Sequence, residues 1–126
     1  MTRKQVVTAK QKNRIFIVDD HPIVRKGLTQ LINQEPDLTV CGEAENAEIA
    51  LELLKKVKPD LAIVDISLRG IDGIELTKLI RARFENIPVL VVSMHDESLY
   101  AERALRAGAR GYIMTVSYTH LRAHET

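Results

Sequence analysis

Residues 60–80 read DLAIVDISLRGIDGIELTKLI, and this stretch predicts a strand, a loop and a helix in direct succession. The run 60–65 is short and largely apolar, as expected for a strand that is buried in a sheet. Asp72, with Glu75 three residues later, resembles a capping box and predicts that a helix opens at residue 73. A buried strand that leads into a helix is the repeating unit of parallel α/β folds.

The rest of the chain repeats this alternation. Strands are predicted at 14–19, 38–45, 60–65, 88–93 and 110–114. Helices are predicted at 21–34, 47–57, 73–84 and 97–107, and Asn46 is expected to cap the second of them. Largely apolar strands that alternate with helices imply a parallel sheet covered on both faces, and right-handed crossovers favour a doubly wound arrangement. We therefore expect one α/β domain with a five-stranded, flavodoxin-like parallel sheet in the order 2-1-3-4-5.

Length, charge and composition exclude several classes of protein. The 126 residues suffice for one domain, and their net charge of +1 provides no basic surface for nucleic acid. Cys41 is the only cysteine, so no internal disulfide can form, and a reducing, cytoplasmic setting is expected, with Cys41 as a small apolar strand residue. No apolar run approaches the ~20 residues of a membrane span. Residues 1–13 are expected to be a flexible leader, because their only apolar stretch is too short for a signal peptide.

Polar side chains end three of the predicted strands: Asp19 and Asp20 the first, Asp65 the third and Ser93 the fourth. Strands 1 and 3 are neighbours in the expected order, so the three carboxylates should meet at one edge of the sheet. Their repulsion would be relieved by a shared proton or by a divalent cation, and an all-oxygen cluster suits Mg²⁺. The alternative is structural: Asp19 and Asp20 would only cap the first helix, and Asp65 would lie in a turn.

Four segments, IFIVDDHPIVRKGL, LAIVDISLRGIDGIEL, PVLVVSMHDE and AGARGYIM, resemble the response-regulator receiver domain in order and spacing. The resemblance covers about residues 14–114 and is closest to the subgroup with a C-terminal helix-turn-helix output of LuxR/NarL/FixJ type. It implies that Asp65 is the phosphoryl acceptor. The ligands that it implies for Mg²⁺ are Asp19, Asp20, Asp65 and the backbone carbonyl of Ser67.

The resemblance also implies a conformational switch. The hydroxyl of Ser93 would contact the phosphoryl group, and Tyr112 would change rotamer when Ser93 moves. The surface between the helix 97–107 and the strand 110–114 would then change shape for a partner. Phosphorylation would bias two pre-existing states rather than create a new one.

The chain departs from the family pattern at its C-terminal end. Receiver domains carry a lysine directly after the strand that matches 110–114, whereas this chain has Thr115, which lacks the charge and the reach to contact a phosphoryl group. Residues 116–126 match the translation of a transposase-type sequencing adaptor, whose frame leaves only the first base of codon 115 native. We therefore expect a non-native tail, a natural lysine at 115 and no metal pair formed by His120 and His124. The last helix of the fold would be missing or non-native, which predicts a marginally stable or self-associating protein.

Together these features predict the receiver domain, residues 14–115, of a two-component response regulator. A sensor histidine kinase would phosphorylate Asp65, and DNA would be bound only through a C-terminal domain that is absent here. The resemblance allows a homodimer and slow autodephosphorylation but predicts no enzyme. One alternative is a receiver-like docking module that is not phosphorylated, which a native Thr115 would favour. An aspartate-dependent phosphatase is disfavoured, because no acid stands two residues after Asp65. His21 and His95 lie beside the acidic loops. A role as ligands is one alternative for them, but both are expected to be ordinary loop residues near a helix start.

Overall fold

The structure, a computed structural model, describes residues 12–93 and 98–114. The strands are β1 (Asn13–Val18), β2 (Leu38–Ala44), β3 (Leu61–Asp65), β4 (Val89–Ser93) and β5 (Gly111–Met114). The helices are α2 (Pro22–Asn33), α3 (Ala47–Val57), α4 (Gly73–Arg83) and α5 (Ser98–Arg106). The predicted tail and nearly all of the predicted leader lie outside the described residues.

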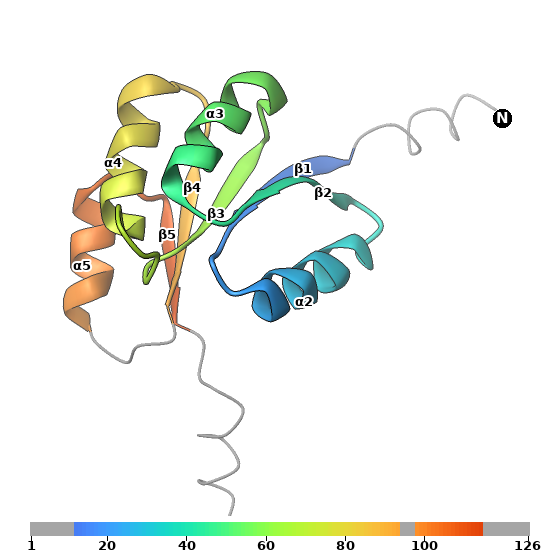
Figure 1. The fold of residues 1–126 in the computed structure, drawn as a ribbon, viewed down its shortest axis with the longest axis horizontal. Coiled ribbons are helices and arrows are strands. Elements are labelled where there is room, and N and C mark those ends of the chain that lie inside the picture. The colour runs from blue at the N-terminus through green and yellow to red at the C-terminus, as the bar shows by residue number, and fades with distance from the viewer. Residues whose placement is uncertain (1–11, 94–97, 115–126) are drawn as a thin grey trace, which may run out of the picture.

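The five strands form one sheet in the order β2-β1-β3-β4-β5, and all neighbouring strands are parallel. This confirms the predicted doubly wound, flavodoxin-like α/β fold. Helices α3, α4 and α5 lie on one face of the sheet, and α2 lies on the opposite face against β1 and β2 (Figure 1). In the described part of the chain, no second helix accompanies α2 on its face.

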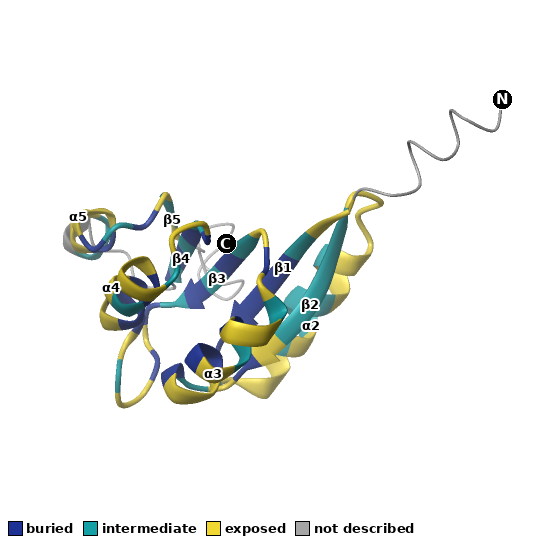
Figure 2. Ribbon diagram, turned by 90° about the horizontal axis from the view of Figure 1, so that it is seen from above, coloured by how far each residue is buried: buried dark blue, intermediate teal, exposed yellow. Residues whose placement is uncertain are grey.

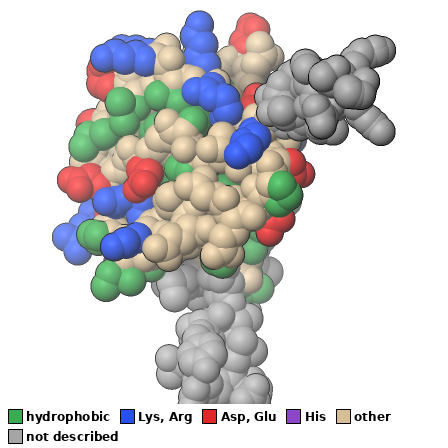
Figure 3. All heavy atoms as spheres, turned by 90° about the vertical axis from the view of Figure 1, so that its right-hand side faces the viewer, with side chains coloured by type: hydrophobic (Ala, Val, Ile, Leu, Met, Phe, Trp, Pro, Cys, Tyr) green, Lys and Arg blue, Asp and Glu red, His purple; other side chains and the backbone are tan. Residues whose placement is uncertain are grey.

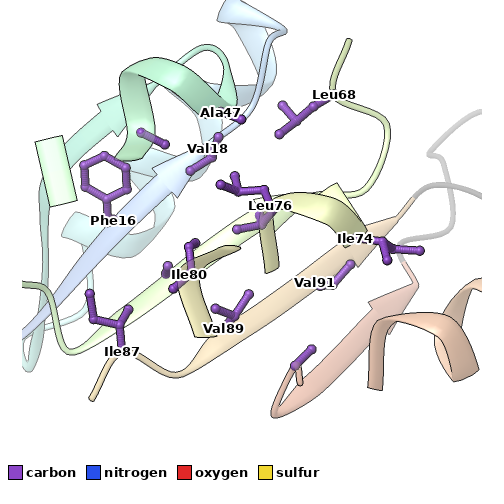
Figure 4. Packing of buried hydrophobic residues seen from close by; sticks show 14 of the residues in the cluster. Phe16, Val18, Ala47, Leu68, Ile74, Leu76, Ile80, Ile87, Val89 and Val91 are labelled. Atoms are coloured by element: carbon purple, nitrogen blue, oxygen red, sulfur yellow. The ribbon is translucent and has the colours of Figure 1, made fainter. Parts of the chain in front are cut away.

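The main hydrophobic core lies between the sheet and the helices α3, α4 and α5 (Figure 4). Successive side chains of a strand point to opposite faces, so only alternate strand residues enter this core. Phe16 and Val18 belong to it, whereas Ile15 and Ile17 are buried toward α2. The helices contribute fully buried side chains, among them Leu54, Leu76 and Ile80. Burying each such side chain contributes roughly 1.5–3 kcal/mol relative to leaving it exposed.

Two helices begin at the caps that the sequence predicts. Oδ1 of Asn46 accepts a hydrogen bond of 2.8 Å from the backbone N–H of Ile49 at the start of α3. Oδ1 of Asp72 accepts one of 2.9 Å from the backbone N–H of Glu75 at the start of α4. Each bond satisfies an N–H that has no partner within its helix, and the second fixes the end of the loop that follows β3.

Helix α2 leaves much of its apolar surface exposed. None of its residues is buried, and Ile23 and Leu31 are 85% and 63% exposed. Most of α2 is accordingly drawn as exposed in Figure 2, and apolar side chains reach the surface among charged ones on the side shown in Figure 3. The cause is the position of the helix, which contacts β1 and β2 but does not extend across β3, β4 and β5.

Candidate functional site

Two neighbouring central strands bring three aspartates to one edge of the sheet. β1 continues directly into Asp19 and Asp20, and β3 ends with Asp65. The two strands are parallel, with Val18 opposite Val64, so the acids follow at the same end of both strands. Carboxylate oxygens of all three aspartates lie within 4.8 Å of one another. The predicted meeting of the three carboxylates is therefore confirmed.

The three carboxylates are largely removed from solvent. The exposed fraction of the side chain is 7% for Asp19, 14% for Asp20 and 12% for Asp65. Like charges repel at this spacing, and burial strengthens the repulsion because less water screens them. The cluster therefore favours the binding of a proton or a cation.

Burial and neighbouring charge act together on Asp65. Burial is the largest cause that raises the pKa of Asp65 above its ordinary value, and the charges of Asp19 and Asp20 raise it further. Ser67 opposes this shift, because its backbone N–H donates to Oδ1 of Asp65 at 3.2 Å and its hydroxyl lies 3.2 Å from each carboxylate oxygen. Ser67 thus holds the carboxylate in one orientation. The predicted role of its backbone carbonyl stays a prediction.

His21 lies in the loop directly before α2, as expected, and its imidazole lies among the acids. Its Nδ1 is 3.1 Å from Oδ1 of Asp19, 3.0 Å from Oδ1 of Asp20 and 3.9 Å from Oδ2 of Asp65. The backbone N–H of His21 also donates to Oδ1 of Asp19 at 2.7 Å, which folds the loop back over the end of β1. The only signal in the sequence is that this histidine directly follows the aspartate pair.

Arg25 connects the acidic loop to the edge of the sheet. Its Nη1 donates to the backbone carbonyl of Asp19, and its Nε donates to Oε1 of Glu43 at 3.0 Å. One side chain of α2 therefore holds both the loop after β1 and the edge strand β2. The sequence gives little sign of this bridge, because Arg25 and Glu43 lie on different elements.

Asp20 is contacted from the loop that follows β3. The backbone N–H of Arg69 donates to Oδ2 of Asp20 at 3.3 Å, and Nε of Arg69 lies 3.8 Å from the same oxygen. Oδ1 of Asp20 is buried and accepts no hydrogen bond from the described residues, although Nδ1 of His21 is near. A buried carboxylate oxygen without a donor is costly, and a bound cation would satisfy it. The residues present therefore fit an oxygen-binding divalent cation such as Mg²⁺.

Ser93 and Tyr112 lie on one face of the sheet, on the neighbouring strands β4 and β5. Val91 is opposite Tyr112 and Ser93 is opposite Met114, so Ser93 and Tyr112 are diagonal neighbours. Ser93 is fully buried, and Tyr112 is half-buried with a hydroxyl that finds no hydrogen-bond partner among the described residues. Their arrangement is compatible with a coupled movement, and the switch itself stays a prediction.

Four residues considered from the sequence, Thr115, His95, His120 and His124, lie outside the described residues. Among the helices that the structure describes, none combines the length and the apolar character needed to cross a membrane.

A doubly wound sheet with three largely buried acids at the ends of two adjacent strands is the architecture of a receiver domain. The chain belongs to the family described as response regulator receiver domain, whose family model matches residues 15–117. This confirms the resemblance inferred from the sequence. Members of this family are signalling proteins rather than classical enzymes, and they generally bind Mg²⁺ at an acidic pocket like the aspartate cluster found here.

Individual relatives point to the NarL/LuxR type of response regulator. The chain is 40% identical to the nitrate/nitrite response regulator protein NarL of Escherichia coli over 102 residues, which are 79% of this chain and 46% of that protein. A LuxR-family two-component response regulator from an Aurantimonas species is 38% identical, with a TM-score of 0.81 over 91% of this chain and 84% of that one. The isolated REC domain of RcsB from Salmonella enterica serovar Typhimurium, solved with the phosphomimetic BeF3⁻, is 27% identical, with a TM-score of 0.78 over 90% and 85%. The chain spans about half the length of the curated relatives it matches.

Proposed function

We propose that Asp65 accepts a phosphoryl group and that this domain is the phosphorylated switch of a two-component response regulator. The observation that carries the proposal is the convergence of Asp65 with two further, largely buried carboxylates at the ends of adjacent strands. The structure of the RcsB receiver with a phosphomimetic supports a phosphoacceptor role for a related chain.

The chemistry assigns Asp65 as the nucleophile. One of its carboxylate oxygens attacks the phosphorus atom of the donor, and an aspartyl phosphate forms. The P–N bond of a phosphohistidine, or the P–O bond of a small acyl phosphate, breaks and its electron pair leaves with the donor. Ser67 holds the carboxylate in place for this attack. Because burial raises the pKa of Asp65, positive charge nearby favours the ionised form that the attack requires.

The residues proposed to hold Mg²⁺ are Asp19, Asp20, Asp65 and the backbone carbonyl of Ser67. When bound, Mg²⁺ would neutralise the carboxylates and the oxygens of the transferring group. The chain prepares this site in advance, because Arg25 fixes the backbone of Asp19 and Arg69 holds one oxygen of Asp20. Oδ1 of Asp20 supports the assignment, since it is buried without a hydrogen-bond donor among the described residues.

The response to phosphorylation is proposed to pass through Ser93 and Tyr112. A dianionic group on Asp65 would attract the hydroxyl of Ser93, and Tyr112 would turn toward the space that this movement leaves. The surface formed by α5 and β5 would change with it. The size of the effect is limited to the difference in free energy that phosphorylation makes between the two states.

The proposal extends to partners and to the division of the chain. A sensor histidine kinase would donate the phosphoryl group in the cytoplasm, and slow autodephosphorylation would reset the switch. Residues 14–115 would form the receiver, 1–13 a flexible leader and 116–126 a non-native tail. The domain would be able to form a homodimer, and transcription would be regulated through a DNA-binding domain that lies outside this chain, as the names of relatives suggest.

The direct test is the intact mass of the protein after incubation with acetyl phosphate and Mg²⁺. We expect the mass of one added phosphoryl group, and no addition in Asp65→Asn. The matched control is Asp72→Asn in the same loop, since Asn caps a helix about as well as Asp and the fold should be kept. Equal labelling of wild type and Asp65→Asn would reject Asp65 as the acceptor.

A second candidate function is a receiver-like docking module that works without phosphorylation. The observation in its favour is Thr115, which stands where receiver domains carry a lysine. It predicts no mass gain in wild type, and no gain in Thr115→Lys either. A gain that appears only in Thr115→Lys would instead show that the acidic site is competent and lacks only the lysine.

A further inference from the structure

The imidazole of His21 lies beside all three aspartates, on the solvent side of the acidic cluster. Its Nδ1 is the one nitrogen among the four groups whose ligand atoms lie within 4.8 Å of one another. We propose that His21 is a fourth protein ligand of the divalent ion and that it shifts the preference of the site from Mg²⁺ toward first-row transition ions. This inference rests on the proposed function only in that both use the same cation site.

The spacing of the donor atoms matches a single coordination sphere. For metal–ligand distances of 2.0–2.1 Å in an octahedron, neighbouring ligand atoms are about 3 Å apart and opposite ones about 4.2 Å apart. Nδ1 of His21 lies 3.1 Å and 3.0 Å from oxygens of Asp19 and Asp20, which corresponds to neighbouring positions. Its distance of 3.9 Å to Oδ2 of Asp65 is close to the value for opposite positions. Small movements would therefore bring all four residues onto one ion.

Two features of the loop leave the imidazole ring of His21 free to bind an ion. The backbone N–H of His21 donates to Oδ1 of Asp19, which fixes the start of the side chain beside the acids. The side chain itself is 58% exposed, so the ring lies on the solvent side of the cluster. A ligand there would replace one of the water molecules that Mg²⁺ otherwise keeps.

The chemical nature of the donor decides the preference. Carboxylate and carbonyl oxygens suit Mg²⁺, whereas an imidazole nitrogen suits ions such as Fe²⁺, Ni²⁺ and Zn²⁺. Without the imidazole, the aspartates and a carbonyl form an ordinary Mg²⁺ site. With Nδ1 added, the set of one nitrogen and several oxygens binds transition ions more tightly while contributing little to the binding of Mg²⁺.

The test uses Co²⁺ as the probe and the full chain as it stands. Isothermal titration gives the affinities for Co²⁺ and Mg²⁺ in wild type and in His21→Asn. We expect the ratio of the two affinities to fall on the order of tenfold in the variant. The matched control is Arg69→Gln, which removes a charge from the same rim but no metal donor, and should change both affinities alike and leave their ratio unchanged.

A spectroscopic readout tests the coordination of His21 in the wild-type protein itself. A histidine bound to Co²⁺ through Nδ1 gives a strongly shifted signal from its ring C–H protons in the NMR spectrum, and this signal does not exchange with solvent. We expect this signal in wild type and its loss in His21→Asn and in His21→Gln, with the circular dichroism of both variants unchanged. Absence of the signal from cobalt-loaded wild type overturns the proposal even if a variant fails to fold.

The outcomes separate this inference from the proposed function. If Co²⁺ and Mg²⁺ bind, Asp65 is phosphorylated, and the ratio of affinities is the same in His21→Asn, the histidine is no ligand and the phosphoacceptor proposal stands. If neither ion binds the folded protein and no phosphoryl group is added to wild type, both proposals fail.

Discussion

Gly73, the first residue of α4, packs directly against the backbone of Asp65, the last residue of β3. A Cβ atom at position 73 would meet the carbonyl oxygen of Asp65 and would lie 2.7 Å from Cα of Ile66. Both obstacles are backbone atoms, which cannot move aside as the end of a flexible side chain can. The start of α4 can therefore approach the acceptor strand this closely only with glycine at position 73.

Gly73→Ala is expected to destabilise the fold by about 1–3 kcal/mol, the usual cost of overpacking a well-packed interior. It should also slow phosphorylation, because relief of the clash would displace the backbone of Asp65 relative to Asp19 and Asp20. Urea unfolding and the rate of labelling by acetyl phosphate measure the two effects. The control is Gly27→Ala in α2, where a Cβ meets nothing within 4 Å and where alanine should stabilise the helix by up to about 1 kcal/mol. Equal stability of both variants would contradict the close approach.

Asp65→Asn is expected to stabilise the protein at neutral pH in the absence of divalent ions. The pKa of Asp65 is raised in the folded state above its ordinary value of 3.8, so the folded protein holds this proton more tightly than the unfolded chain. The stability contributed by the proton is fully present below 3.8 and is lost as the pH rises through the raised pKa. The advantage of the neutral variant should therefore grow across this window and then level off. Urea unfolding of both proteins in chelator, from below pH 3.8 to neutrality, measures it, and a difference independent of pH would refute the assignment.

Addition of Mg²⁺ should stabilise the wild-type protein, because the ion binds the folded cluster and not the unfolded chain. At a free Mg²⁺ concentration one hundred times Kd, the gain is about 2.7 kcal/mol. Asp19→Asn and Asp20→Asn should each lose most of this gain, whereas Asp72→Asn should keep it. Thermal unfolding with Mg²⁺ and with chelator measures the difference. A Tm that does not respond to Mg²⁺ in wild type would argue against a cation at this site.

The exposed apolar side chains of α2 predict self-association at high protein concentration. Ile23 and Leu31 lie beside a sheet face that no second helix covers in the described part of the chain. Leu31→Gln should weaken the association while changing the free energy of unfolding by no more than about 0.5 kcal/mol, since the side chain is already exposed. Sedimentation velocity at several concentrations measures this. Ile49→Gln alters an exposed apolar residue of α3 on the other side of the sheet and should leave the association unchanged. A monomer at every concentration would contradict the prediction.

The sheet and the three acids could be predicted because they depend on chain order alone. Once β1 and β3 are recognised as adjacent parallel strands, the residues that follow them must meet, whatever their rotamers. The caps at Asn46 and Asp72 were predictable for a similar reason, since each acts within three residues of its own position.

The sequence did not predict the contacts that depend on side-chain rotation. A turn about χ1 decides whether the ring of His21 points into the cluster or toward solvent, and residue type does not fix that angle at an exposed loop position. The Arg25 bridge depends on where α2 settles on the sheet, which is a property of tertiary packing. The exposure of Leu31 has the same origin, because an amphipathic pattern shows which side of a helix is apolar but not how much sheet lies beneath it.

The bridge from Glu43 through Arg25 to the carbonyl of Asp19 has a consequence for the energy of the pocket. The loop behind the acids is tethered to the sheet margin, so it cannot spread outward to lessen the crowding of negative charge. The electrostatic repulsion among the carboxylates therefore persists until a cation or a proton neutralises part of the negative charge. A rigid scaffold of this kind keeps the carboxylates close together and thereby strengthens the binding of a cation.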